Sequence, residues 1–441
     1  MKAALLSLVG VVTLVSPARA GEAGKREMTL DQALQAARSS HPQLQAARAQ
    51  TDASAARIQE ARAPLLPQVT GSASYLRSEG SVSATTVGTG TASGATTTTV
   101  SSSIQGRNLY SASLGASELL YDFGQTTGRW NAAKAAFRSQ EESERAFAVQ
   151  VGFNLRSAYF AAAAARALVK VAQENLQNQE AHLRQIQGFV EAGTRPEIDL
   201  AQARTDRANA KVQLINAEVA YDTDKALLNQ AMGIEGSTDY DVAAPAAREV
   251  SGEDDTTDEL LAEALKARPD LLSLARQVDA QELTTRSIKG GYAPSLNASA
   301  SLSESGPELD ALDWGFRGIL SLNWQIFGGG ITDAQVRESR ANTAALRAQY
   351  ELQRQQVRAD VEQARLGVRA TKAAIEATHE AATNARVRLT LAEGRYQAGV
   401  GNIIELGDAQ VALTTAAAQE VQAVFNLATA RARLWQALGQ P

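Results

Sequence analysis

The sequence of 441 residues has no cysteine, three histidines, ten prolines and only 5% aromatic residues. Without cysteine it has no disulfide framework and no thiol that could carry a lipid or a metal ion. The histidines, His41, His182 and His379, are far apart in the sequence, and neither an HExxH motif nor a phosphate-binding glycine loop is present. We therefore expect no enzyme, no cofactor and no metal site.

Long apolar runs are missing as well. The longest lies within residues 1–20, after Lys2 and before the small-residue site Ala18-Arg19-Ala20, and it is too short to span a bilayer. We interpret residues 1–20 as a cleaved secretory signal peptide. Its removal takes away two positive charges and no acid, which changes the net charge from −5 to −7 and argues against nucleic acid as a partner. A membrane location would therefore depend on strands.

The chain contains an internal repeat. HPQL at 41–44 matches RPDL at 268–271, and EAGTRPEIDLAQAR at 191–204 matches QAGVGNIIELGDAQ at 397–410. The first pair is 227 residues apart and the second pair 206 residues apart. The first repeat must therefore carry an insertion between these two motifs.

This insertion lies at 78–106, where 20 of 29 residues are Ser, Thr or Gly. Such a segment cannot bury enough apolar surface to order itself, so we expect a flexible loop. The predicted organisation is a first repeat over 21–235, a polar linker over 236–257 and a second repeat over 258–441.

Hydrophobic periodicity and the positions of glycine and proline predict two strands, a very long helix and a returning helix in each repeat. The expected strands are about 69–77, 109–121, 295–304 and 314–327, the long helices 125–190 and 330–396, and the returning helices 197–232 and 403–438. At 1.5 Å per residue, each long helix would measure about 100 Å.

The predicted strands are two-faced. In the stretch 294–305, apolar residues alternate with small uncharged polar ones: Leu296, Ala298, Ala300 and Leu302 against Ser295, Asn297, Ser299, Ser301 and Ser303. This pattern is typical of a transmembrane barrel, and the alternative is a periplasmic β-layer packed on a helix. Glu118 falls on the apolar phase of 109–121, so either it lies at the membrane interface or a bulge shifts the strand.

Four strands do not close a barrel with a lumen, and one chain would leave two edges unpaired in lipid. Strands that span a membrane would therefore need several chains in one barrel. The long helices repeat apolar residues every seven positions, as at Val361, Val368, Ile375, Ala382, Leu389 and Tyr396, which indicates coiled coils. Taken alone, these helices also suit a soluble coiled-coil filament.

Together these features resemble the TolC family of outer membrane factors over about residues 28–440. The resemblance rests on the duplicated plan, on Phe123-Gly124 and Phe327-Gly328 after the strands, and on Ala192-Gly193 and Ala398-Gly399 at the helix turns. It implies an α+β fold and a homotrimer. Twelve strands, four per chain, would form one β-barrel in outer-membrane lipid, continued by a long α-helical coiled-coil barrel in the periplasm.

The resemblance also implies a function. The protein would be an outer-membrane channel, the passive exit duct of a tripartite efflux or type I secretion system, gated at its periplasmic helical tip. Its partners would be a periplasmic adaptor (membrane fusion) protein and an inner-membrane transporter. The alternative is a structural periplasm-spanning tether or coiled-coil surface protein anchored by its strands. The cargo and the identity of pump and adaptor stay open.

Two acidic residues follow the second helix turn. Glu405 and Asp408 are three residues apart and share a helix face. The resemblance implies that they form an acidic ring at the pore entrance. The alternative is local, because Asn402 and Glu405 have the spacing of a capping box and acids in a first helical turn offset the helix dipole.

The resemblance further places a gating latch at Asp199 and Tyr396. The arginine that completes this latch in the family is replaced here by Gly401, and Arg195 is a candidate substitute. Tyr396 also ends the heptad row, so packing alone would explain it.

Gly193 and Gly399 match the glycines at which adaptor hairpins contact the helical tips in the family. The alternative role is the helix-ending turn for which glycine is suited in any protein.

Overall fold

The computed structural model describes residues 26–86, 99–244 and 249–440. The predicted signal peptide lies outside these residues, as does the centre of the predicted loop. The chain divides into two compact units, and each takes segments from both halves of the sequence. We call them the sheet unit (Pro42–Gln150, Gly252–Leu366 and Arg433–Pro441) and the tip unit (Met1–His41, Val151–Ser251 and Gly367–Ala432).

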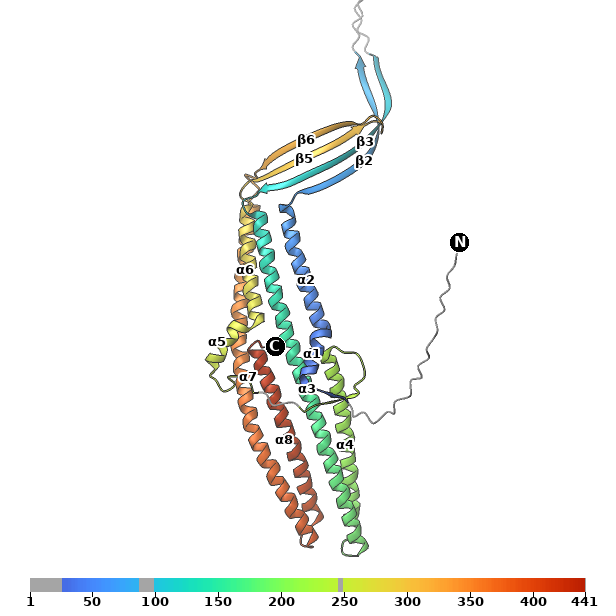
Figure 1. Cartoon of the computed structure of the whole chain (residues 1–441), viewed down its shortest axis with the longest axis vertical. Coiled ribbons are helices and arrows are strands. Elements are labelled where there is room, and N and C mark those ends of the chain that lie inside the picture. Colours follow the sequence, from blue (N-terminus) through green and yellow to red (C-terminus); the bar gives the residue numbers. More distant parts are fainter. Residues whose placement is uncertain (1–25, 87–98, 245–248, 441) are drawn as a thin grey trace, which may run out of the picture. The chain divides into compact units, whose positions relative to one another are not determined.

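The sheet unit holds an antiparallel sheet with strand order β2-β3-β5-β6 (Figure 1). Its strands are β2 Gln68–Thr86, β3 Thr99–Tyr121, β5 Ser295–Gly306 and β6 Asp313–Asn323. The first two extend into 78–106, so the expectation of a flexible loop is wrong for both ends of that segment, where threonine and valine favour extended backbone. β6 is shorter than expected and ends at Asn323, after which the Trp324 indole N–H donates to the Tyr292 carbonyl at 3.1 Å.

The register of the sheet confirms the two-faced pattern. Leu302 of β5 pairs with Leu114 of β3 and with Phe316 of β6, and these residues define the apolar face. On the opposite side, which we call the polar face, the hydroxyls of Ser72 and Ser113 are hydrogen-bonded at 2.8 Å. The strands therefore place mainly apolar side chains on one face and mainly small polar side chains on the other, with Arg317 and Ile319 of β6 as exceptions on the polar face.

Glu118 lies on the apolar face. It pairs with Ala298, and the β-bulge of β3 comes after it, between Leu119 and Tyr121. The bulge therefore does not move this acid to the polar face. Glu118 is half-buried and sits three residues before the end of β3, which favours the expectation of an acid near the edge of the apolar band.

Two helices of 67 residues, α3 Gln125–Glu191 and α7 Ile331–Gln397, contribute to both units. In the sheet unit the further helices are α2 Pro42–Arg62, the 3₁₀ helix Ala63–Leu65, α5 Thr257–Ala267 and α6 Pro269–Gly290. α3 and α6 approach closely where α3 begins, because a Cβ on Gly290 would lie 2.9 Å from the backbone nitrogen of Gln125. Glycine is required there by the close backbone contact.

The tip unit consists mainly of paired helices (Figure 1). α3 is followed by α4 Glu197–Met232, and α7 by α8 Ile403–Ala437. The unit also contains α1 Leu30–Ser40 and a parallel pair of short strands, β1 Arg26–Met28 and β4 Tyr240–Val242. The long and returning helices begin and end within one residue of the predicted positions.

The heptad row of α7 faces inward. Of the predicted row, Val361, Val368, Ala382, Leu389 and Tyr396 are buried, as coiled-coil packing requires, and Ile375 is half-buried. In the described part of the chain, no helix combines the length and the apolar character needed to cross a membrane.

Candidate functional site

The two helix turns of the tip unit share one geometry. After α3, Gly193 adopts φ 73°, and the N–H of Thr194 donates to the carbonyl of Phe189 at 2.9 Å. After α7, Gly399 adopts φ 78°, and the N–H of Val400 donates to the carbonyl of Arg395 at 3.1 Å. Positive φ strains a residue with a Cβ, so both glycines act as helix-ending residues.

Tyr396 connects the two helix pairs. Its ring is 1% exposed, and its hydroxyl donates to Oδ2 of the buried Asp199 at 3.1 Å. The guanidinium of Arg195 lies over the same ring, 4.3 Å from its centre, and Nη2 donates to the Tyr396 carbonyl at 2.8 Å. The structure thus brings the three predicted latch residues into one cluster, which we call the tyrosine cluster.

The electrostatics of the tyrosine cluster keep the phenol neutral. Burial, and then the Asp199 carboxylate, raise the pKa of Tyr396 to about 12, with Arg195 opposing both. A neutral phenol can donate its proton to a carboxylate, whereas a phenolate would repel it. The hydroxyl therefore remains a donor to Asp199 throughout the physiological pH range.

Apolar side chains enclose the tyrosine cluster. The buried residues in contact are Ile186, Ala203, Leu389, Ala392, Leu406 and Ala409. His182 is also buried, with its ring centre 5.9 Å from that of Tyr396, and its Nε2 has no hydrogen-bond partner among the described residues. Burial lowers the pKa of His182, opposed by a hydrogen bond with Gln185.

Gly401 explains why the arginine comes from the other turn. A Cβ on Gly401 would lie 2.9 Å from the backbone nitrogen of Tyr396 and 3.0 Å from the carbonyl carbon of Arg395. The Gly401 N–H donates to the Arg395 carbonyl at 2.9 Å, so the chain folds tightly back on the end of α7. An arginine side chain does not fit at this position of the backbone, and Arg195 supplies the cation instead.

Glu405 and Asp408 lie apart from the tyrosine cluster. Oε1 of Glu405 is 3.1 Å from Nε of Arg395, and its backbone N–H donates to Oδ1 of Asn402 at 2.7 Å. Asn402 therefore caps α8, whereas the Glu405 side chain pairs with Arg395, so half of the capping box that the spacing predicted is formed. Asp408 is exposed.

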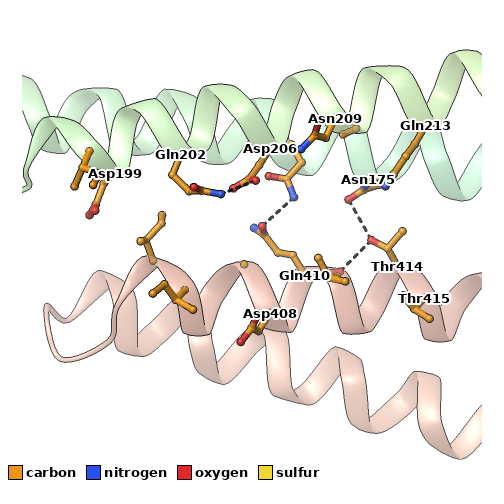
Figure 2. A pocket seen from close by; sticks show the side chains of 17 residues that line it. Asn175, Asp199, Gln202, Asp206, Asn209, Gln213, Asp408, Gln410, Thr414 and Thr415 are labelled. Atoms are coloured by element: carbon orange, nitrogen blue, oxygen red, sulfur yellow. Dashed lines mark hydrogen bonds between the residues drawn. The ribbon is translucent and has the colours of Figure 1, made fainter.

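A groove of about 650 Å³ separates the two helix pairs (Figure 2). Gln202, Asp206 and Gln213 of α4 line one side, and Asp408 and Thr415 of α8 line the other. Burial raises the pKa of Asp206, opposed by a hydrogen bond from Gln202. Three aspartates and no basic side chain are among the 17 lining residues, so within the described chain the groove is acidic.

Two hydrogen bonds that were not predicted from the sequence cross the groove. Nε2 of Gln179 donates to Oε1 of Gln410 at 2.9 Å, both side chains being buried. The hydroxyl of Thr414 donates to Oδ1 of Asn175 at 3.2 Å (Figure 2). We call these four residues the amide clasp. Its only sequence signal is a glutamine between Leu176 and Leu183, at a position that heptad packing usually fills with an apolar side chain.

Comparison with known proteins places this geometry in a family. The model of the outer membrane efflux protein family matches residues 33–234 and 260–440. The chain belongs to the outer membrane efflux protein family. This confirms the resemblance drawn from the sequence and the expected location in the outer membrane.

Related efflux proteins cover most of the chain. The solvent efflux pump outer membrane protein SrpC of Pseudomonas putida is 24% identical over 325 residues, covering 72% of this chain and 68% of its own. The outer membrane efflux protein BepC of Brucella suis is 24% identical over 327 residues, covering 73% and 70%.

Two solved outer membrane proteins share the fold. The CmeC channel of Campylobacter jejuni superposes with a TM-score of 0.79 at 18% identity, covering 93% of this chain and 85% of its own. The outer membrane protein VceC of Vibrio cholerae gives 0.77 at 18% identity, covering 93% and 96%. These likenesses confirm the mixed fold of helices and strands.

Among the described residues, no group of three or more His, Asp or Glu side chains could hold a metal ion.

Proposed function

We propose that this protein is the passive, gated exit duct of a tripartite efflux or type I secretion system. The observation that carries the proposal is the two-faced sheet. Leucine and aromatic side chains are aligned on one face, and serine hydroxyls lie on the opposite face. An apolar face suits lipid and a small polar face suits a water-filled lumen. The matched relatives are named as outer membrane components of efflux pumps, which supports the same role.

Such a duct requires more than one chain. β2 and β6 end the strand order, so each has one edge without a partner strand among the described residues. Unpaired edges are not viable in lipid, and four strands cannot enclose a lumen. We propose a homotrimer with a twelve-stranded barrel in the outer membrane and a helical barrel in the periplasm.

The gate would be formed by the tip unit. The tyrosine cluster joins the α3–α4 pair to the α7–α8 pair through Asp199, Tyr396 and Arg195. Opening would require these contacts to break. In a trimer, Glu405 and Asp408 would each occur three times around the entrance, and a ring of carboxylates favours cations.

The partners follow from the passive mechanism. A passive duct needs an energy source elsewhere, and an inner-membrane transporter would supply it. A periplasmic adaptor would contact the turns at Gly193 and Gly399. The candidate from another class, a structural tether anchored by strands, has no use for a hydrogen-bonded gate.

Two measurements test the proposal. Single-particle electron microscopy of the detergent-extracted protein should show a threefold cylinder with an axial lumen, and particles without a lumen would favour the tether. In planar bilayers, the double variant Glu405→Ala/Asp408→Ala should lose the cation preference of the wild type. Unchanged selectivity would reject the acidic ring and leave the duct in place.

A further inference from the structure

Where all four strands of the sheet pair, the polar face carries one basic side chain, and Arg107 of β3, on the same phase, lies beyond this part, where β3 pairs with β2 alone. The register places Arg317 of β6 on this face, opposite Ser301 of β5. In the part of the sheet where all four strands pair, Arg317 is the only Lys or Arg on the polar face, and Asp313 is the only acid. The remaining positions of that part are mainly serine, with threonine, asparagine, glutamine, two glycines and one apolar side chain, Ile319 of β6 opposite Ser299.

Arg317 is exposed, and no described carboxylate pairs with it. Asp313 is four residues away along the same strand, about 13 Å at the usual rise, which is beyond ion-pair distance. By contrast Arg77, which lies on the phase of the apolar face, is paired with Glu79 at 2.8 Å. The four-stranded part of the sheet thus leaves one guanidinium available on the polar face.

The surroundings of Arg317 suit an anion. Ser301 lies opposite, and Ser299 and Ser303 flank it on the same face of β5. Gly115, the partner of Ser301 on β3, places no side chain there. A guanidinium binds oxyanions with two parallel hydrogen bonds, and neighbouring hydroxyls can donate to the same oxygens.

We propose that Arg317 and the hydroxyls of Ser299, Ser301 and Ser303 form an oxyanion-binding position, which takes carboxylate or phosphate groups of passing solutes. The inference rests on the proposed function, because it requires the polar face to line the lumen. Three copies would then form a basic ring, opposite in sign to Glu405 and Asp408. Rings of arginine favour anions in pores.

The test measures ion selectivity and block of single channels in planar bilayers. In a KCl gradient, Arg317→Ser should raise the cation-to-anion permeability ratio about two- to threefold, since a unit charge about 7 Å away in water changes the ion's energy by roughly RT. Inorganic phosphate should reduce the wild-type current, and this block should be lost in Arg317→Ser. Arg317→Lys should keep the selectivity and weaken the block, because lysine lacks the bidentate geometry.

Arg77→Ser is the matched control, because it removes the same charge from the other face and should change neither readout. Arg317→Gln replaces Arg317→Ser if the serine variant does not assemble. Channels of Arg317→Ser with wild-type selectivity and wild-type phosphate block would overturn the oxyanion position and leave the duct intact, as would equal effects of Arg77→Ser and Arg317→Ser. Absence of channels in the wild type would instead reject the proposed function.

Discussion

The two turns of the tip unit begin alike and differ in what they hold. Each ends a long helix with a glycine at positive φ, and each places an acid in the first turn of the next helix, Asp199 after the first turn and Glu405 at the matching position after the second. Asp199 is buried and accepts a hydrogen bond from the other helix pair. Glu405 is half-exposed and pairs with Arg395 of its own helix pair.

The residue two positions after each glycine accounts for this difference. Arg195 extends from the first turn over the ring of Tyr396, whereas Gly401 at the matching position lets the second turn fold back on α7. The first turn therefore provides contacts across the tip, and the second turn receives them. Separation of the helix pairs would break the contacts of Tyr396 and leave the Glu405–Arg395 pair intact.

The largest expected effect comes from removing the residue that receives these contacts. Tyr396→Ala should destabilise the closed tip by about 3–5 kcal/mol, because it leaves a cavity in a buried cluster and an unpaired Asp199. Amide hydrogen exchange of residues 186–200 and 389–410 should speed up strongly. Tyr396→Phe keeps the packing and should cost about 1 kcal/mol. Equal effects of both variants would show that the hydroxyl, and not the ring, holds the tip.

The comparison can be tested at Gly401, by giving the second turn a Cβ at the position where the first turn has Arg195. Gly401→Ala should destabilise the second turn by about 1–3 kcal/mol, because the added Cβ meets backbone atoms that cannot move aside. The control is Gly399→Ala. A Cβ at Gly399 would have open space around it, so the expected loss of stability, about 1–2 kcal/mol, comes from positive φ alone. Thermal melting of the detergent-solubilised protein, together with hydrogen exchange of the turn, measures the loss of stability in both variants. A neutral Gly401→Ala would mean that the second turn is looser than described.

Arg195 tests the contribution of the first turn. Arg195→Ala should destabilise the tip by about 1–2 kcal/mol, since it removes one hydrogen bond to a carbonyl and a cation over a buried ring. Arg195→Lys should retain part of this stability. Channel recordings should show more frequent opening of Arg195→Ala, while Arg204→Ala, on the same helix pair, serves as a charge control. Identical recordings for both variants and the wild type would reject Arg195 as the substitute for the missing arginine.

Much of this architecture can be predicted from the sequence. The ends of α3, α4, α7 and α8 were predictable because glycine marks the turns and the heptad row runs up to them. The faces of the strands were predictable because a period of two fixes which residues share a side.

Other features depend on information that one sequence does not contain. Hydroxyl-rich composition suggested a loop where β2 and β3 continue, because composition cannot show that two such segments pair with each other. The partners of Gln179 and Asn175 lie more than 200 residues away, and nothing local specifies the register between two helix pairs. Arg195 could be named only as a candidate, since the choice depends on the room at Gly401.

The smallest expected effect concerns pH, and it separates packing from charge in the tyrosine cluster. Because burial holds the pKa of His182 below its usual 6.5, the open tip binds a proton more readily than the closed tip as pH falls below 6.5. The stability that neutral His182 provides is complete above pH 6.5 and is lost as pH falls through the lowered pKa, by at most about 1.4 kcal/mol per pH unit. Hydrogen exchange of residues 186–200 should therefore speed up as pH falls from 7.5 to 5.5, mainly below pH 6.5. His182→Gln should remove the pH dependence, whereas His379→Gln, at an exposed histidine hydrogen-bonded to Glu420, should retain it. A pH dependence that survives in His182→Gln would assign the proton to another group and leave the tyrosine cluster held by packing and Arg195 alone.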